Sequence, residues 1–482
     1  MKPDFPFFHA YDPESGRLSL RGADSIPDAA IDFAREFGVR IFDASDGDLT
    51  DLPPAFATLE SVSVVFLSGN PITRVPPVLA DMARIRMLAF KGCAIRHIDP
   101  GALPAGLCWL VLTGNGLAAL PGDIGRLGEL EKLALAGNAL NALPESLQDC
   151  RKLGLIRLSA NAFETAPPAW IYDLPMLGWY GDAGNAFARF PAPDSTLPVY
   201  AWGDISLGEK LGESPSSEVF RAALPDGDVV ALKLFRGFLT SDGRPEDDRA
   251  ACLQAGNHPQ LMCVRGALTG HPDGRAGLAL GLVPADFRTI GLPPSLYSVS
   301  SSCDDESVQA SRRLRAIGRG CGRNPHTDSY SMNENPYRSC TRDDFTPGTT
   351  FTLPFIANAA LDVAQAAAHL HARGLMHGDI YAHNIMADSS GRALLGDFGA
   401  ASPCGDHAAA RQAIDVRGYG CFLDDLLARA DEAAREAGEY ATLRALADSC
   451  MGEIRARPDF AAISALLSSS TRRALPMPPS RR

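Results

Sequence analysis

The 482-residue chain lacks several features that define broad classes of protein. It contains no run of about eighteen apolar residues, so we predict no membrane-spanning helix. Its N-terminus shows no basic segment followed by an apolar core, so we predict no signal peptide and a cytoplasmic location. The formal net charge of −12 argues against general binding to nucleic acid or to anionic membranes.

Closely spaced cysteines are also missing, because the eleven cysteines are scattered and form no C-x-x-C pair. Zinc sites and disulfide frameworks depend on such spacings, so we expect free thiols in a reducing compartment. Hydrophobic residues make up 46% of the chain and charged residues 21%, which is typical of a packed protein. The length allows two or three domains.

A sequence repeat with steps of 22 to 24 residues occupies the N-terminal part of the chain. The frame around each repeated asparagine is L-x-x-L-x-L-x-x-N, which resembles the leucine-rich-repeat family. The resemblance implies an α/β solenoid over residues 37–190, preceded by a cap over residues 1–36, in which stacked strands bury their leucines together. The equivalent positions are Gly47, Asn70, Cys93, Asn115, Asn138, Asn161 and Asn185.

The asparagine of each unit is expected to bond backbone groups that the bend leaves unpaired. Gly47 and Cys93 lack an amide, so we predict that they cannot form these bonds and that their turns are looser. Asp182 stands where the last unit should have a leucine. We interpret this last unit as an atypical terminal repeat.

The strand residues between the leucines are expected to line the concave face of the solenoid. A mixed row with an exposed Trp109 predicts a surface for a protein partner or substrate. The alternative is a solvated scaffold in which Trp109 packs locally. The predicted concave residues are Phe66, Lys91, Trp109, Val111, Thr113, Lys132, Arg157 and Ser159.

Two short stretches carry candidate residues for phosphoryl transfer: 377–384 (HGDIYAHN) and 397–399 (DFG). Asn384 lies five residues after Asp379 and thirteen before Asp397. This spacing resembles the catalytic loop and metal-binding turn of the protein-kinase superfamily. The resemblance implies that the catalytic Asp379 orients the acceptor hydroxyl, and that Asn384 and Asp397 hold Mg²⁺ on the phosphates of ATP.

The same resemblance implies an α+β, two-lobed protein-kinase-like domain over residues 205–470, after a linker over residues 191–204. Lys233, in the strand Val230–Lys233, matches the lysine that holds the phosphates. We choose Asp248 as the acidic partner of Lys233. The other predicted ATP-binding residues lie on the glycine-rich loop, the lysine strand and the hinge: Gly212, Val219, Ala231, Leu280, Gly281 and Val283.

Several positions depart from the kinase pattern. Ser214 and Ser217 replace two glycines of the loop over the phosphates, which weakens the expected nucleotide contact. Gly378 replaces the arginine that pairs with a phosphorylated activation loop, and Ser402 is the hydroxyl residue of a short activation segment. We therefore predict that phosphorylation there does not switch activity. Tyr381 replaces the usual lysine.

Two further segments show no usable period. Residues 297–339 are predicted to be a disordered insert. Either residues 299–339 are translated from an unspliced intron, or the insert is regulatory and carries phosphorylation sites. Residues 471–482 form a basic, proline-containing tail that we also predict to be disordered.

Together these features predict an ATP- and Mg²⁺-dependent protein kinase with a protein-binding repeat module. The expected acceptor is an alcohol group, on serine or threonine rather than tyrosine. One alternative is a kinase of small hydroxylated molecules, because the His-Gly-Asp sequence also occurs in aminoglycoside phosphotransferases. The other alternative is a pseudokinase scaffold, because the glycine-rich loop is degenerate.

Overall fold

The computed structural model describes residues 7–191, 197–213, 217–237, 239–294 and 339–474. The chain forms two compact units, Met1–Leu153 with Pro294–Arg342 and Gly154–Pro293 with Asp343–Arg482. Within the described residues, no helix is both long enough and apolar enough to span a membrane.

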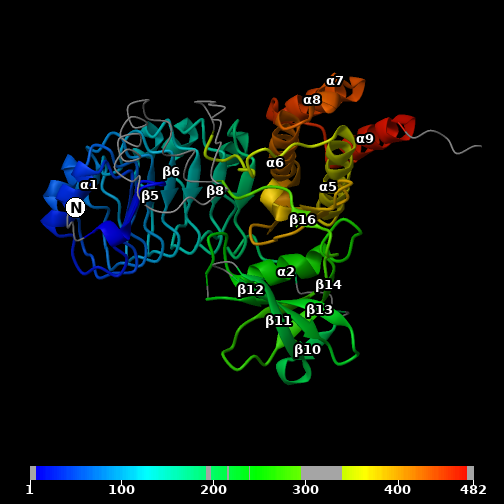
Figure 1. Cartoon of the computed structure of the whole chain (residues 1–482), viewed down its shortest axis with the longest axis horizontal. Coiled ribbons are helices and arrows are strands. Elements are labelled where there is room, and N and C mark those ends of the chain that lie inside the picture. Colours follow the sequence, from blue (N-terminus) through cyan, green and yellow to red (C-terminus); the bar gives the residue numbers. More distant parts are fainter. Residues whose placement is uncertain (1–6, 192–196, 214–216, 238, 295–338, 475–482) are drawn as a thin grey trace, which may run out of the picture. The chain divides into compact units, whose positions relative to one another are not determined.

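The first unit contains one short strand per repeat. Consecutive strands pair in parallel from β2 to β7, so equivalent residues of neighbouring repeats lie side by side (Figure 1). The strands are β3 (Ile41–Asp43), β4 (Val64–Phe66), β5 (Met87–Ala89), β6 (Trp109–Val111) and β7 (Lys132–Ala134). The cap consists of the hairpin β1 (Tyr11–Asp12) and β2 (Arg17–Ser19) and the helix α1 (Asp28–Glu36).

The repeated asparagines connect neighbouring repeats through their side chains. The Nδ2 of Asn70 donates to the carbonyl oxygens of Ala44 and Leu67, at 2.8 Å each. Its Oδ1 accepts from the backbone N–H of Leu49 at 3.0 Å. One amide thus satisfies three backbone groups that the turns leave unpaired.

Cys93 shows that one part of the prediction for this ladder is wrong. Its thiol donates to the carbonyl oxygen of Leu67 at 3.3 Å, across the same 26-residue separation that joins Asn70 to Ala44. A thiol is a weak donor, but it reaches the same carbonyl position as an amide. Only Gly47 lacks a side chain for this bond.

The predicted concave row of the first unit is more buried than the sequence suggests. Thr113 and Lys132 are buried, and the Lys132 ammonium lies 4.1 Å from the centre of the Trp109 ring. Trp109 also packs on a cluster that includes Cys340, whose backbone N–H donates to Glu131 at 2.8 Å. Trp109 is therefore partly buried rather than exposed, because other parts of this unit cover it. The binding of a protein partner stays a prediction.

The second unit begins with the last two repeats. Their strands β8 (Leu155–Arg157) and β9 (Trp179–Gly181) pair in parallel. The compact units thus separate between residues 153 and 154, whereas the sequence placed the end of the repeats at residue 190. The side-chain contacts described below explain why these two repeats group with the C-terminal part.

A six-stranded sheet follows, in the order β10-β14-β15-β13-β12-β11, with the helix α2 (Pro245–Ala255) beside it (Figure 1). Strand β10 corrects the predicted linker, because Val199 pairs with Ala267 of β14 and adds a strand to the sheet edge. The strands are β10 (Val199–Ala201), β11 (Ser206–Glu213), β12 (Ser217–Ala223), β13 (Val229–Phe235), β14 (Val264–Thr269) and β15 (Gly277–Gly281).

The remainder of the second unit is mainly helical. The helices are α5 (Leu353–Ala372), α6 (Ala408–Ala428), α7 (Glu432–Glu436), α8 (Gly438–Met451) and α9 (Phe460–Ala474). The short strands of this part are β16 (Arg288–Thr289), which precedes α5, and β17 (Leu375–Met376), β18 (Ile385–Ala387), β19 (Ala393–Leu395) and β20 (Ser402–Pro403), which lie between α5 and α6.

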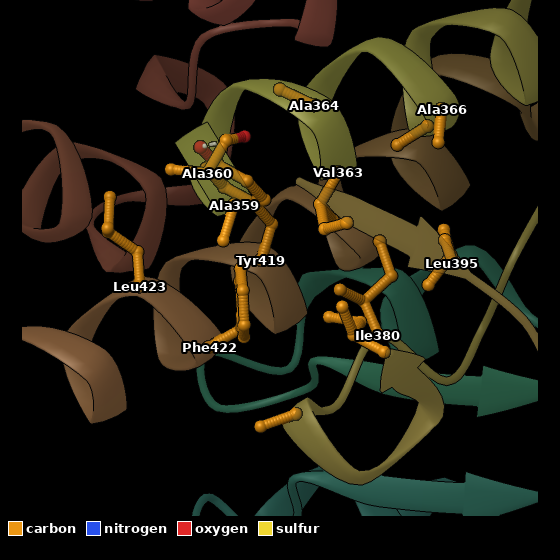
Figure 2. Packing of buried hydrophobic residues seen from close by; sticks show 14 of the residues in the cluster. Ala359, Ala360, Val363, Ala364, Ala366, Ile380, Leu395, Tyr419, Phe422 and Leu423 are labelled. Carbon is orange, nitrogen blue, oxygen red and sulfur yellow. Dashed lines mark hydrogen bonds between the residues drawn. The ribbon is translucent and has the colours of Figure 1, made fainter. Parts of the chain in front are cut away.

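The core of this part forms where α5 and α6 meet the segment around Ile380. Figure 2 shows Ala360 and Val363 of α5 packing with Phe422 of α6 and with Ile380, and all four residues are at most 1% exposed. Small alanines on α5 let α6 approach closely, and the Tyr419 hydroxyl donates to the Ala360 carbonyl at 3.0 Å. This core holds the segment around Ile380 in place.

Other predicted segments fall partly outside the described residues. Residues 297–338 of the predicted insert lie there, as do Ser214 in the glycine-rich loop and residues 475–482 of the tail. The tail was predicted to begin at residue 471, but α9 continues through Ala474. The basic residues at this end are good helix formers, so the helix extends past the predicted boundary.

Candidate active site

The predicted catalytic loop is held by a carboxylate of helix α6. Asp415 accepts from the backbone N–H of His377 at 2.7 Å and from that of Gly378 at 2.8 Å. Its Oδ2 also lies 3.0 Å from Nε2 of His371. These bonds fix the backbone on the N-terminal side of Asp379.

Asp379 and Asn384 are brought together by the turn between them. The Nδ2 of Asn384 donates to the Asp379 carbonyl at 3.0 Å and to its Oδ2 at 2.7 Å. Because the amide nitrogen is used in this way, the amide oxygen of Asn384 is the atom left to face a cation. Burial raises the pKa of Asp379, while Arg157 opposes that shift.

Asp397 adopts the left-handed backbone conformation, with φ of 59°, and its Oδ1 accepts from the N–H of Gly399 at 3.2 Å. Burial acts to raise its pKa, but the Lys233 charge and the Gly399 hydrogen bond outweigh burial and lower it. Asp397 therefore stays ionised. An ionised carboxylate and an amide oxygen form a donor set that suits Mg²⁺, so Asp397 and Asn384 fit the metal that the sequence implies.

Lys233 forms a buried ion pair with Asp248 of helix α2, at 2.7 Å between Nζ and Oδ2. Burial acts to lower the pKa of Lys233, but the charges of Asp248 and Asp397 raise it above its ordinary value. The charge of Asp397 thus acts on the Lys233 ammonium, and Asp248 is the carboxylate that pairs with it directly. The predicted choice of Asp248 as the acid beside Lys233 agrees with this pairing.

The sheet register aligns the predicted nucleotide-binding residues on neighbouring strands. Gly212 of β11 pairs with Val219 of β12, and Val219 pairs with Lys233 of β13. Two residues before Lys233 on β13, Ala231 pairs with Leu280 of β15. These residues therefore form one continuous part of the sheet.

The predicted hinge lies next to a cavity of about 410 Å³ that Gly281 and Val283 help to line. The other lining residues are Asn257, His258, Pro259, Leu261, Met262, Cys263, Leu282 and Leu394. Lys233 and Asp397 are not among them. The N–H of Gly281 donates to the carbonyl of Cys263 at 2.7 Å, so this donor is used within the sheet.

The sequence interpretation missed two residues of this site. Arg157 on β8 was assigned to the concave face, yet it pairs with Asp379 and donates from Nη1 to the Gly378 carbonyl at 3.2 Å. Its Nε also pairs with Asp242 at 2.6 Å. Nothing in the repeat pattern marks an arginine at this position for the catalytic loop.

The second residue is Asp182, in the last repeat, which contacts helix α6. Its carboxylate pairs with Arg411 of α6 through two bonds of 3.0 and 2.5 Å, and it accepts from the Tyr180 hydroxyl at 2.8 Å. A leucine at this position could not neutralise the buried guanidinium. The break in the repeat frame was the sequence signal, and its reason is this ion pair.

Comparison with known proteins bears on the C-terminal part of the chain. Residues 313–417 match the family described as protein tyrosine and serine/threonine kinase. This segment contains Asp379, Asn384, Asp397 and Asp415, and the match supports a protein kinase. It covers less than half of the chain and does not reach Lys233.

Among solved structures, the chain is similar to a leucine-rich-repeat protein of Leptospira interrogans, with 23% identity and a TM-score of 0.32. The similar region covers 35% of this chain and 43% of that protein. No curated protein matches the sequence. A similarity this low does not bear on function, so the activity rests on the family match and on the geometry of the site.

Proposed function

We propose that this chain is an ATP- and Mg²⁺-dependent protein kinase that phosphorylates serine or threonine residues. The main observation behind the proposal is the ion pair of Lys233 with the buried Asp248, together with the charge of the solvent-exposed Asp397, which acts on the same ammonium. A structural ion pair needs only one carboxylate. A second carboxylate at the DFG turn fits a site in which a cation and a metal ligand both face phosphates.

Each residue has a proposed role. Lys233 holds the phosphates, and Asp248 keeps its ammonium charged and oriented. The Asn384 amide oxygen and the Asp397 carboxylate hold Mg²⁺, which neutralises charge on the phosphates of bound ATP. Asp379 accepts a hydrogen bond from the acceptor hydroxyl and orients it for attack.

The proposed adenine contacts lie on the aligned strands. Val219, Ala231 and Leu280 offer apolar surface for the base, and Gly212 lies beside Val219 without a side chain in the way. Because the Gly281 N–H is used on Cys263, we propose the backbone of Val283 as the hinge hydrogen-bonding group.

A second candidate function is phosphorylation of small hydroxylated molecules. Ser402 is fully buried and its hydroxyl accepts from the backbone N–H of Asp182 at 3.0 Å. The activation segment is thus covered by the last repeat, which leaves little surface for a peptide. The family match and the repeats favour a protein acceptor.

The test measures ATP binding and phosphoryl transfer from labelled ATP separately. We expect Asp379→Asn to lower transfer by about 10²–10⁴-fold with ATP affinity kept, because only hydroxyl orientation is lost. We expect Lys233→Met to weaken ATP binding itself. The matched control is Lys152→Met, since Lys152 pairs with Glu129 on the surface of a repeat.

The outcomes separate the candidate functions. ATP binding that Lys233→Met does not weaken would contradict the proposed site. ATP binding without transfer to any acceptor, in the wild-type chain and in Arg157→Gln alike, would favour the pseudokinase scaffold. Transfer to small hydroxylated compounds but not to protein would favour the second candidate.

A further inference from the structure

Arg157 uses every edge of its guanidinium within the catalytic site. Nε pairs with Asp242, Nη1 donates to the Gly378 carbonyl, and Nη2 pairs with Asp379. Its side chain is only 3% exposed, although an arginine on the concave face of a solenoid normally reaches solvent. All three nitrogens of the Arg157 guanidinium are therefore bonded to groups of this site.

The contact leaves Asp379 poorly able to receive a substrate. Its Oδ1 accepts from Arg157 and its Oδ2 accepts from Asn384 at 2.7 Å. The side chain of Asp379 is 15% exposed. A hydroxyl-orienting carboxylate must present an oxygen to the acceptor, and here a guanidinium occupies that oxygen.

The backbone of the last repeat reinforces this closed arrangement. The N–H of Tyr180 donates to the Gly378 carbonyl at 3.2 Å. A Cβ on Gly378 would lie 2.2 Å from the backbone carbonyl oxygen of Tyr180, so only glycine lets the two backbones approach this closely. The Trp179 ring stacks on Tyr381, with centroids 4.4 Å apart, and its Nε1 donates to the Ile380 carbonyl at 3.2 Å.

The activation segment is covered by the same repeat. Asp182 binds both Ser402 and Arg411, the latter from helix α6. A Cβ on Gly181 would lie 3.0 Å from the carbonyl oxygen of Ala400. Residues 179–182 therefore pack on both the loop that carries Asp379 and the activation segment.

We propose that the last two repeats, residues 154–185, autoinhibit the kinase by holding Arg157 on Asp379 as a substitute for the acceptor. This inference rests on the proposed kinase function. Activity requires that Arg157 leave Asp379, so that an acceptor hydroxyl takes its place. If Arg157 instead supported transfer as a positioning residue, each substitution of Arg157 would lower the transfer rate.

The test is Arg157→Gln in the full chain, with labelled ATP and a generic protein acceptor. We expect the transfer rate to rise at least tenfold, while ATP affinity changes less than twofold, since Lys233 and Asp248 are not touched. Arg126→Gln is the control, because Arg126 is also a repeat arginine paired with an aspartate. Adding Asp379→Asn to Arg157→Gln should abolish the gain.

A folded Arg157→Gln protein that binds ATP and transfers phosphate at or below the wild-type rate would overturn the autoinhibition. If this variant does not fold, Arg157→Lys replaces it, with a smaller rise expected because one ammonium cannot serve both carboxylates. An unchanged or lower rate there, or failure of both variants to fold, also overturns it. Loss of all ATP binding in the wild-type protein would instead defeat the proposed function.

Discussion

Asp247 and Asp248 are neighbours on helix α2, but their carboxylates lie in different environments. Asp248 points to Lys233, whereas Oδ2 of Asp247 is buried without a hydrogen-bond partner among the described residues. A Cβ on Gly184 would lie 2.4 Å from that oxygen, so Asp247 lies against the end of the last repeat. Burial raises its pKa to about 6, because the charged form is poorly solvated.

This environment predicts a pH-dependent stability. Since the pKa is about 6 in the folded state and about 3.9 in the unfolded state, the folded state binds a proton more tightly. The stabilisation is fully present below pH of about 3.9 and is lost as pH rises through about 6. At pH 7.5 we therefore expect Asp247→Asn to stabilise the protein by roughly 1–2 kcal/mol, measured by urea unfolding.

The pH profile supplies the control for this substitution. The stability difference between Asp247→Asn and wild type should shrink as pH falls from 7.5 to 4.5, because the wild-type carboxyl becomes protonated. The exposed Glu246 on the same helix turn gives the matched change, and Glu246→Gln should leave stability nearly unaltered. A difference in the free energy of unfolding that stays constant across this pH range would contradict the raised pKa of Asp247.

At the scale of elements, the catalytic loop and strand β9 depend on each other. Gly378 has φ of 73° and faces the Tyr180 backbone, so the loop and β9 approach at backbone distance. Gly378 stands where the kinase pattern has an arginine, and its approach to β9 leaves no room for a side chain. The loop and the last repeat are thus matched to each other.

Gly378→Ala is expected to be strongly destabilising. The new Cβ would lie 2.2 Å from the backbone carbonyl oxygen of Tyr180, and the alanine would also have to adopt the left-handed backbone conformation of Gly378. The control is Gly374→Ala, because Gly374 has φ of 69° but no atom within 4 Å of its Cβ position. We expect Gly374→Ala to cost about 1 kcal/mol and Gly378→Ala at least about 3 kcal/mol by urea unfolding.

Equal losses from the two glycine substitutions would mean that β9 does not contact the loop in solution. A larger loss at Gly378, together with a raised transfer rate, would be consistent with the autoinhibitory contact. The unfolding measurement therefore tests the contact between β9 and the loop, and the transfer rate tests the autoinhibition.

At the scale of the molecule, the repeat boundary and the structural boundary do not coincide. Residues 154–185 follow the repeat frame in sequence, yet they belong to the compact unit that carries the catalytic loop. The buried pair of Arg411 with Asp182 is one reason, since losing one partner of such a pair leaves an uncompensated charge inside the protein. The buried stack of Trp179 on Tyr381 is another.

A chain shortened to residues 197–482 should therefore lose stability, because Arg411 loses its carboxylate and Tyr381 its aromatic neighbour. We expect it to unfold at a lower temperature than residues 154–482, or to aggregate, as measured by circular dichroism and light scattering. Residues 154–482 should unfold cooperatively. Equal unfolding temperatures for the two shortened chains would contradict the assignment of the last two repeats to the second unit.

Much of the arrangement within each unit could be predicted from local pattern. The strand predicted at Val230–Lys233 lies within β13, and the stacked strands predicted from the repeat frame pair in parallel from β3 to β7, since hydrophobic periodicity marks both. The segment at Val199 was mistaken for a linker because the neighbouring prolines hide a strand at the sheet edge. The choice of Asp248 as the acidic partner of Lys233 agrees with the ion pair in the structure.

The repeat frame, the spacing of Asp379, Asn384 and Asp397, and the lysine strand are properties of short stretches, so the sequence by itself determined them. The tertiary structure alone decided that Arg157 pairs with Asp379 and Asp182 with Arg411, across 222 and 229 residues. Those pairs depend on which faces two distant segments bury against each other. Burial then makes unpaired charge so unfavourable that the partners must meet.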